Sequence, residues 1–293
     1  MTLLLTVLEV VAPVFLLASL GFGWVKLGYD YPVEFVTRLA MTLAVPCLIF
    51  TALMRTEIAP ATLGTMTLAS LLGYGLIGLV ALLGLLVLGL DRRTFFAPLT
   101  FGNTGNVGLP LALFAFGETG LGFAVVTFAV SSILIFTVGI WSVAGKGTGW
   151  RVLREPMVLA TLLGALFLWQ GWTTPRVLTN ALTLLGQMAI PLMLITLGVA
   201  VARLSPGSLG RAVGLSAAKV VVCVAVAVGT GQMLGLPEVA QGVLVLQLAT
   251  PVAVTSYLLA QKYGADAPAV AGFVVVSSLM SVAVFPAILA VLL

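Results

Sequence analysis

The chain has 293 residues, of which 61% are hydrophobic and only 8% are charged, and its mean hydropathy is +1.24. Soluble domains carry about 25% charged residues, so this composition cannot coat a water-facing surface and indicates an integral membrane protein. No stretch is polar enough for a soluble ATPase, kinase or receptor domain, and no Walker motif is present. The net charge of +4 comes from scattered loop residues, which favours membrane topology over nucleic-acid binding.

The residue types that are missing exclude several kinds of chemistry. The chain has no histidine, which excludes Ser-His hydrolysis, HExxH zinc chemistry and histidine-ligated haem. Cys47 and Cys223 lie inside apolar runs, where we expect small buried hydrophobic residues rather than a disulfide or metal ligands. We therefore expect no metal site, no cofactor and no enzymatic activity.

Apolar segments follow one another along the whole chain, each close to the length of about 20 residues that crosses a bilayer. The first segment lacks a basic n-region and a small-residue cleavage site, so we expect a retained helix and not a signal peptide. The ten predicted segments run from about Leu4 to Val25, Val33 to Met54, Ala61 to Leu90, Phe95 to Phe116, Gly120 to Ala144, Pro156 to Trp172, Pro175 to Ala202, Leu209 to Leu234, Glu238 to Gln261, and Pro268 to the C-terminus.

Lysine and arginine lie mainly on one side of the predicted membrane. Only Arg55 and Arg176 lie on the other side. The positive-inside rule then puts the basic side in the cytoplasm, with both termini outside the inner (plasma) membrane. The basic side carries Lys26, Arg38, Arg92, Arg93, Lys146, Arg151, Arg154, Arg203, Arg211 and Lys262.

The two halves of the chain repeat a pattern of prolines. Three prolines around the second segment recur around the seventh at offsets of 143, 145 and 146 residues. A repeated unit of five helices, here residues 1–145 and 155–293, has to be inserted upside down the second time, because five is odd. The sequence therefore predicts the inverted-repeat architecture of secondary transporters. The matching pairs are Pro32 with Pro175, Pro46 with Pro191, and Pro60 with Pro206.

The fourth segment contains too many helix-breaking residues to be an ordinary lipid-facing helix. Glycine costs about 1 kcal/mol at an interior helical position and proline about 3. Backbone released from a helix at membrane depth has to be buried in protein or line a wet cavity. The break is formed by Gly102, Asn103, Thr104, Gly105, Asn106, Gly108 and Pro110.

The ninth segment holds a second break, in the equivalent place of the second repeat. Two broken helices in corresponding halves predict a substrate site at the membrane midplane, where half-helix N-termini favour an anion such as a carboxylate. The alternative is that glycine and proline only kink two packed helices, with Asn and Thr as hydrogen-bonding glue. The candidate residues here are Gln247, Thr250, Pro251 and Thr255, beside the amides of Asn103 and Asn106.

These motifs resemble those of the auxin efflux carrier family, which includes plant auxin transporters and bacterial malate or malonate permeases. The resemblance covers nearly the whole chain, and its most specific part is the fourth-segment motif. It rests on Val45-Pro46-Cys47-Leu48-Ile49-Phe50, Gly102-Asn103-Thr104-Gly105-Asn106-Val107-Gly108-Leu109-Pro110-Leu111, Phe116-Gly117-Glu118 and Ala249-Thr250-Pro251.

The resemblance implies an all-α membrane protein of ten helices in two inverted five-helix repeats, with helices four and nine crossing at the midplane, as in sodium/proton antiporters and bile-acid symporters. It implies a scaffold of helices 1, 2, 6 and 7, a transport bundle of helices 3–5 and 8–10, and a homodimer. Asn103 matches the asparagine that contacts the substrate carboxylate in the plant carriers, and Pro251 matches their ninth-helix proline. Val252 stands where the plant carriers have a polar residue, and only about ten residues join the two halves, which speaks against auxin specificity and loop phosphorylation.

Lys219 lies about ten residues into the eighth segment. A lysine at membrane depth is costly and is a functional hypothesis by default. It could attract the anion, or replace a coupling cation by losing and regaining a proton; the alternative is a lysine that snorkels to the interface or pairs structurally. No aspartate lies deep in a span, which disfavours proton/sodium exchange, whereas a sodium site of carbonyls, Gln247, Thr250 and serines stays open.

The leading interpretation is a secondary transporter of small organic anions, which are carboxylates of the auxin-like or dicarboxylate kind. It works by alternating access at a crossover site at the membrane midplane, with the lipid bilayer as its environment and protons or sodium as the coupling ion. A sodium symporter of the bile-acid-carrier type is the first alternative, and an anion channel is the second. An intramembrane enzyme is the weakest alternative, because the sequence shows no spacing of Ser and Lys that suggests a catalytic dyad.

Overall fold

A computed structural model describes residues 3–144, 156–204 and 209–292, and these residues form helices and no strand. The first half contains α1 (Leu3–Lys26), α2 (Val33–Leu39), η1 (Ala40–Ala44), α3 (Val45–Arg55), α4 (Pro60–Leu88), α5 (Arg92–Thr100), η2 (Thr104–Gly108), α6 (Leu109–Leu134), η3 (Ile135–Gly139) and α7 (Ile140–Ala144). The second half contains α8 (Pro156–Gln170), α9 (Arg176–Gln187), α10 (Ala189–Arg203), α11 (Leu209–Met233), α12 (Glu238–Leu248), α13 (Val254–Tyr263) and α14 (Ala267–Leu292).

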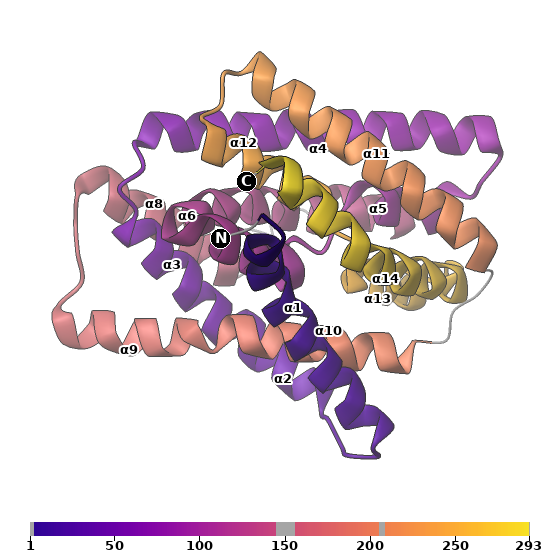
Figure 1. The fold of residues 1–293 in the computed structure, drawn as a ribbon, viewed down its shortest axis with the longest axis horizontal. Coiled ribbons are helices and arrows are strands. Elements are labelled where there is room, and N and C mark those ends of the chain that lie inside the picture. The colour runs from indigo at the N-terminus through magenta and orange to yellow at the C-terminus, as the bar shows by residue number, and fades with distance from the viewer. Residues whose placement is uncertain (1–2, 145–155, 205–208, 293) are drawn as a thin grey trace.

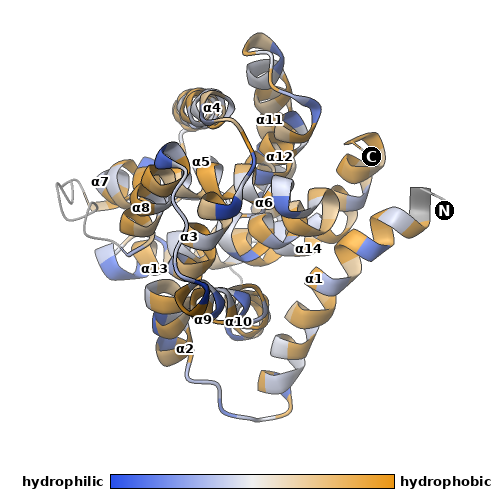
Figure 2. Ribbon diagram, turned by 90° about the vertical axis from the view of Figure 1, so that its left-hand side faces the viewer, coloured by the Kyte–Doolittle hydropathy of each residue, from blue (hydrophilic) through white to orange (hydrophobic). Residues whose placement is uncertain are grey.

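The long helices α4, α6 and α14 are apolar all round, and many large apolar side chains of the molecule face outward. Leu16 of α1 is 68% exposed and Val87 of α4 is 86% exposed. Helices of this kind belong in lipid, where exposed apolar side chains cost nothing. Apolar residues make up most of the outer helices α1, α4 and α14 (Figure 2). Within the described ranges seven helical stretches are long and apolar enough to cross a membrane, and α8 and α12 are shorter apolar helices.

One of these seven stretches, Thr104–Ala144, has 41 residues and is too long for a single straight crossing. It changes direction at Gly117, whose φ of 63° and ψ of −156° are not helical. Such a conformation suits glycine, which has no Cβ. The bend lies between the fourth and fifth segments predicted from the sequence, which end at about Phe116 and begin at about Gly120.

The helices pack in two groups. In the first, α1 lies along α10, and α3 packs against both α8 and α9. In the second, α4 packs against α5, α6 and α11, while α12 and α14 both pack against α11. The long helix α4 and the pair α9–α10 run along opposite edges of the molecule, and the two chain ends lie close together (Figure 1). The groups meet where α1 contacts α14 and α6, where α3 contacts α6, and where α10 contacts η2.

Candidate functional site

The two broken helices touch one another at their breaks. Gly102, after the end of α5, pairs with Val252, before the start of α13, in an isolated antiparallel bridge. The Asn103 N–H donates to the Pro251 carbonyl at 2.7 Å, and the Ala253 N–H donates to the Phe101 carbonyl at 3.5 Å. Each break thus satisfies backbone groups of the other, as non-helical backbone at membrane depth requires.

Glycines of the first break are required by close contacts with the second. A Cβ at Gly102 would collide with the Thr250 hydroxyl and lie 2.9 Å from the Thr250 carbonyl oxygen. A Cβ at Gly108 would collide with the Gln247 amide oxygen. Both Thr250 and Gln247 are fully buried. Thr250 and Gln247 of the second break therefore pack directly against the glycines of the first break.

A cavity of about 570 Å³ lies on the other side of the first break. Its volume is in the range of small-molecule sites, which is about 300–1,000 Å³. All three π-helical segments contribute to its wall: η1 through Met41 and Thr42, η2 through Thr104 to Asn106, and η3 through Ile135 and Phe136. π-Helical turns are rare and are frequent at functional sites, so their convergence on one cavity marks it as the candidate site.

The charges at the cavity have one sign. Arg203 and Lys262 are the charged residues among the described residues that line it, and no described carboxylate does so. The Arg203 guanidinium also donates to the Tyr31 carbonyl at 2.9 Å, and the Lys262 ammonium lies 5.4 Å from the centre of the Tyr263 ring. The rest of the wall is mostly apolar, with hydroxyl groups from Thr37, Ser131 and several other residues. This environment favours an anion over a cation.

Two helices begin at the cavity wall. Asn103 precedes η2, and its side-chain oxygen accepts a hydrogen bond from the Asn106 N–H at 3.3 Å. Val254 and Thr255, the first residues of α13, line the cavity from the second break. First-turn N–H groups have no carbonyl partner within their own helix and carry partial positive charge. The Asn103 side-chain nitrogen is buried and has no hydrogen-bond partner among the described residues, as is also true of both amide atoms of the Gln247 side chain.

The structure brings some of the predicted site residues to the cavity and places the others behind it. Gln247, Thr250, Gly108 and their neighbours Pro110 and Pro251 do not line the cavity, and the first three form the packed contact between the breaks. The predicted residues at the cavity wall are Gly102, Asn103, Thr104, Gly105, Asn106 and Thr255.

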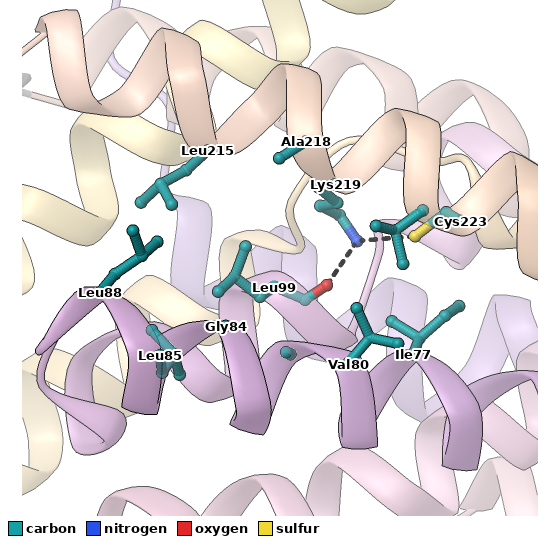
Figure 3. A pocket seen from close by; sticks show the side chains of 12 residues that line it. Ile77, Val80, Gly84, Leu85, Leu88, Leu99, Leu215, Ala218, Lys219 and Cys223 are labelled. Carbon is teal, nitrogen blue, oxygen red and sulfur yellow. Dashed lines mark hydrogen bonds between the residues drawn. The ribbon is translucent and has the colours of Figure 1, made fainter.

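Lys219 is buried, at 4% exposure, but lies outside the large cavity. It lines a separate apolar pocket of about 130 Å³ between α4 and α11. Figure 3 shows its ammonium group pointing from α11 toward the end of α5, where it donates to the Leu99 carbonyl at 3.3 Å. Its other contact is the Cys223 sulfur at 3.9 Å. Both cysteines are free and buried.

Several cavity residues were not singled out from the sequence. Most of them come from segments without a break, and Tyr257 and Lys262 lie on α13 beyond the second break, because the wall is assembled from helices far apart in the chain. Adjacent hydroxyls inside an apolar span, as at Ser131 and Ser132, are a signal that could have found part of this wall. The missed polar and charged residues are Thr37, Thr42, Ser131, Ser132, Thr196, Arg203, Tyr257 and Lys262.

Comparisons with known proteins give a consistent result. A family model described as "Membrane transport protein" matches residues 6–152 and 140–289. The chain is 26% identical to a protein named "Putative malonate transporter" from Rhizobium meliloti, over 89% of this chain and 90% of that one. It is also 26% identical to an "Uncharacterized transporter" from Methanothermobacter thermautotrophicus, over 95% of this chain and 96% of that one.

Proposed function

Because the chain belongs to the membrane transport protein family, the auxin efflux carrier family that its motifs resemble, we propose that it is a secondary transporter of small organic anions. Family and relatives make it a transporter and not an enzyme. The observation that carries the proposed substrate class is the cavity of about 570 Å³ whose described charged residues are both cations.

We propose that the substrate is a carboxylate held at the first break. Asn103 and Asn106 supply amide donors, Thr104 and Thr255 supply hydroxyls, and the starts of η2 and α13 supply positive potential. A carboxylate also gives the unpaired Asn103 nitrogen a partner; a buried donor left unpaired costs about 1–3 kcal/mol. Arg203 and Lys262 attract the anion to the cavity. The name of the Rhizobium relative makes malonate the first compound to test.

The proposed architecture is ten spans in two inverted five-helix repeats. Its spans are α1, α2–α3, α4, α5–η2 up to Gly117, the following part of α6 to α7, α8, α9–α10, α11, α12–α13 and α14. Packing supports this division: the contact of α1 with α10 joins spans 1 and 7, and the contact of α8 with α3, the next most extensive one, joins spans 6 and 2. These two contacts are interchanged when the repeats are exchanged. A homodimer, as the resemblance implies, is part of the proposal.

Alternating access is proposed to come from movement between the two packing groups. The cavity lies between them: α2, η1, α8 and α10 line one side, and η2, α6, η3 and α13 line the other. The first group is the proposed scaffold. The second group is the proposed transport bundle, which also includes α4, α5, α7, α11, α12 and α14. With both termini outside the inner membrane, Arg203 and Lys262 face the cytoplasm.

A thermal-stability screen of the purified protein tests this proposal. The panel contains malonate, malate, benzoate and indole-3-acetate, each in sodium and in choline buffer, with choline chloride alone as the control. A carboxylate that binds the folded state at one hundred times its Kd stabilises it by about 2.7 kcal/mol. No shift with any carboxylate counts against an anion site.

Transport is then measured as counterflow in proteoliposomes. Saturable counterflow of the bound carboxylate supports a carrier, and unitary currents in planar bilayers indicate a channel instead. Counterflow that needs sodium, with a thermal shift that appears only in sodium buffer, favours the bile-acid-type symporter. Counterflow driven by a proton gradient in choline buffer identifies the proton as the coupling ion.

A further inference from the structure

Lys219 occupies a special place at the end of a half-helix. Leu99 lies in the last turn of α5, next to the first break. The final carbonyls of a helix have no partner within the helix and carry partial negative charge. The Lys219 ammonium donates to one of them, the Leu99 carbonyl, from a pocket that shares no lining residue with the substrate cavity.

No described carboxylate forms an ion pair with Lys219. Its recorded partners are the Leu99 carbonyl and the Cys223 sulfur, and the remaining wall of its pocket is apolar, with Ile77, Val80 and Leu85 from α4 (Figure 3). Among the described residues, the group that faces the Lys219 ammonium with opposite partial charge is the end of α5. The part of the Lys219 charge that is not compensated therefore stays with the helices that surround Lys219.

The corresponding place in the first repeat is uncharged. Gly73 precedes Lys219 by 146 residues, the same offset that relates Pro60 to Pro206. A Cβ at Gly73 would lie 2.7 Å from a methyl group of Leu248, the last residue of α12. The end of α12 is bonded instead by an uncharged group, because the Thr250 hydroxyl donates to the Gln247 carbonyl at 2.7 Å. A cation therefore lies beside the first break, and the equivalent position beside the second break has none.

We infer that Lys219 is a positioning residue that gives the moving helices a fixed positive charge, so that a bound anion is charge-compensated when it crosses the membrane. This inference rests on the proposed function, in which α5 and α11 both belong to the transport bundle. Lys219 then adds one positive charge at membrane depth to the empty bundle, and the loaded bundle carries one negative charge fewer there than the anion alone would give it. Lys219 acts without touching the substrate.

The consequence is a division of the voltage dependence between two steps. Homoexchange, with the same anion on both sides, involves only the loaded bundle, whereas net transport also requires the empty bundle to return. Removing the charge of Lys219 makes the loaded bundle more negative by one unit and leaves the empty bundle without its charge at membrane depth. The voltage dependence of exchange should increase, and that of the empty return should disappear.

The test compares Lys219→Gln with Lys219→Arg in proteoliposomes. Glutamine keeps a donor for the Leu99 carbonyl but has no charge, whereas arginine keeps the charge. Lys26→Gln, which removes an exposed charge at the end of α1, is the matched control. The probes are radiolabelled malonate and benzoate, a divalent and a monovalent carboxylate, with the membrane potential set to zero or inside-negative by potassium and valinomycin.

In the Gln variant we expect an inside-negative potential of about 60 mV to slow labelled uptake by exchange up to about ten-fold more than in the wild type, because one more negative charge moves through the field. The Arg and Lys26→Gln variants should respond as the wild type does. An unchanged voltage response in the Gln variant, with exchange still saturable, overturns the role of Lys219 alone. Absence of saturable exchange with either probe in the wild type overturns the proposed function, and this inference with it.

If Lys219→Gln does not give folded protein, Cys223→Ala combined with Lys219→Arg keeps the charge and removes the second contact of residue 219. The inference requires this variant to keep the wild-type voltage response. A shift of the voltage dependence in this charge-retaining variant shows that packing, and not charge, sets the response, and overturns the inference.

Discussion

The two breaks occupy equivalent places in the chain but have different surroundings. The first break, at Gly102 and Asn103, lines the cavity and has a lysine at the end of the half-helix that precedes it. The second break, at Thr250 to Val252, is fully buried, and its Val252 N–H donates a hydrogen bond to the Ser277 hydroxyl oxygen of α14 at 3.0 Å. One break therefore presents polar groups to the cavity, whereas the other packs behind it. In the proposed repeat, the two breaks form unequal half-sites.

The largest effect should come from disturbing the contact between the breaks. Gly102→Ala forces a Cβ against Thr250, and overpacking of this kind costs about 1–3 kcal/mol. Gly75→Ala in α4 is the control, since a Cβ there meets no atom within 4 Å. Thermal unfolding of the purified protein should show a clear decrease in Tm for Gly102→Ala only. Equal Tm values for the two variants would contradict the close approach of the breaks.

Asn103→Ala and Thr250→Ala distinguish a residue that binds the carboxylate from one that stabilises the packing between the breaks. Because Asn103 lines the cavity and Thr250 does not, Asn103→Ala should weaken carboxylate binding about ten-fold or more, as expected for a hydrogen bond to a charged group. Thr250→Ala should lower Tm and change affinity less. Titration of the thermal shift against malonate measures both quantities. The opposite order of affinities would place the carboxylate at the second break.

Arg203→Gln and Lys262→Gln should have smaller effects on binding. Both side chains are exposed at the cavity wall, where solvent and salt screen their charge. We expect each variant to weaken carboxylate binding a few-fold at low ionic strength and by less in 0.5 M salt. Affinity measured at the two salt concentrations checks this. A loss that does not depend on salt would mean that the cation contacts the bound anion directly.

The smallest effect concerns Asp91, at the N-terminus of α5. A hydrogen bond from the Thr94 hydroxyl at 2.6 Å, helped by the Arg93 and Thr94 N–H groups, lowers the pKa of the Asp91 carboxyl. A carboxyl with a lowered folded-state pKa stabilises the protein above its unfolded pKa of about 3.9, and this contribution is lost as the pH falls through the folded-state pKa.

Asp91→Asn should therefore reduce Tm slightly at pH 7, by less than the roughly 1 kcal/mol typical of an N-cap because the site is exposed. The difference between Asp91→Asn and the wild type should shrink as the pH is lowered below about 4. Glu238→Gln, in the first turn of α12, is the corresponding change in the second repeat. A difference between wild type and Asp91→Asn that grows toward low pH would contradict this assignment.

Much of this protein could be predicted from local patterns. Apolar runs identified the helices, since hydropathy is a property of each segment and depends little on its neighbours. The glycines, asparagines and prolines around Asn103 and Pro251 predicted interruptions, and the helices are interrupted at both places. The family is confirmed by the matching model. Motifs of this kind can be recognised in the sequence because each consists of a few contiguous residues.

Contacts between distant segments could not be predicted in the same way. The sequence treats Thr250 and Asn103 alike, as polar residues at a break, but only the packing shows that Thr250 fills the space beside Gly102 while Asn103 faces a cavity. Arg203 and Lys262 counted only as loop charges in the topology. Their proximity to the cavity depends on where α10 and α13 end relative to η2.

The sequence alone determined how many charged residues the chain has and that most of them lie outside the spans. Lipid excludes charged groups from most of a spanning helix whatever the tertiary arrangement. What each remaining charge does was decided by the tertiary structure. Lys219 is a lysine at membrane depth in the sequence; in the folded chain it is directed to the end of α5 and away from the cavity. Electrostatic interactions depend on distance and burial, and only packing sets these.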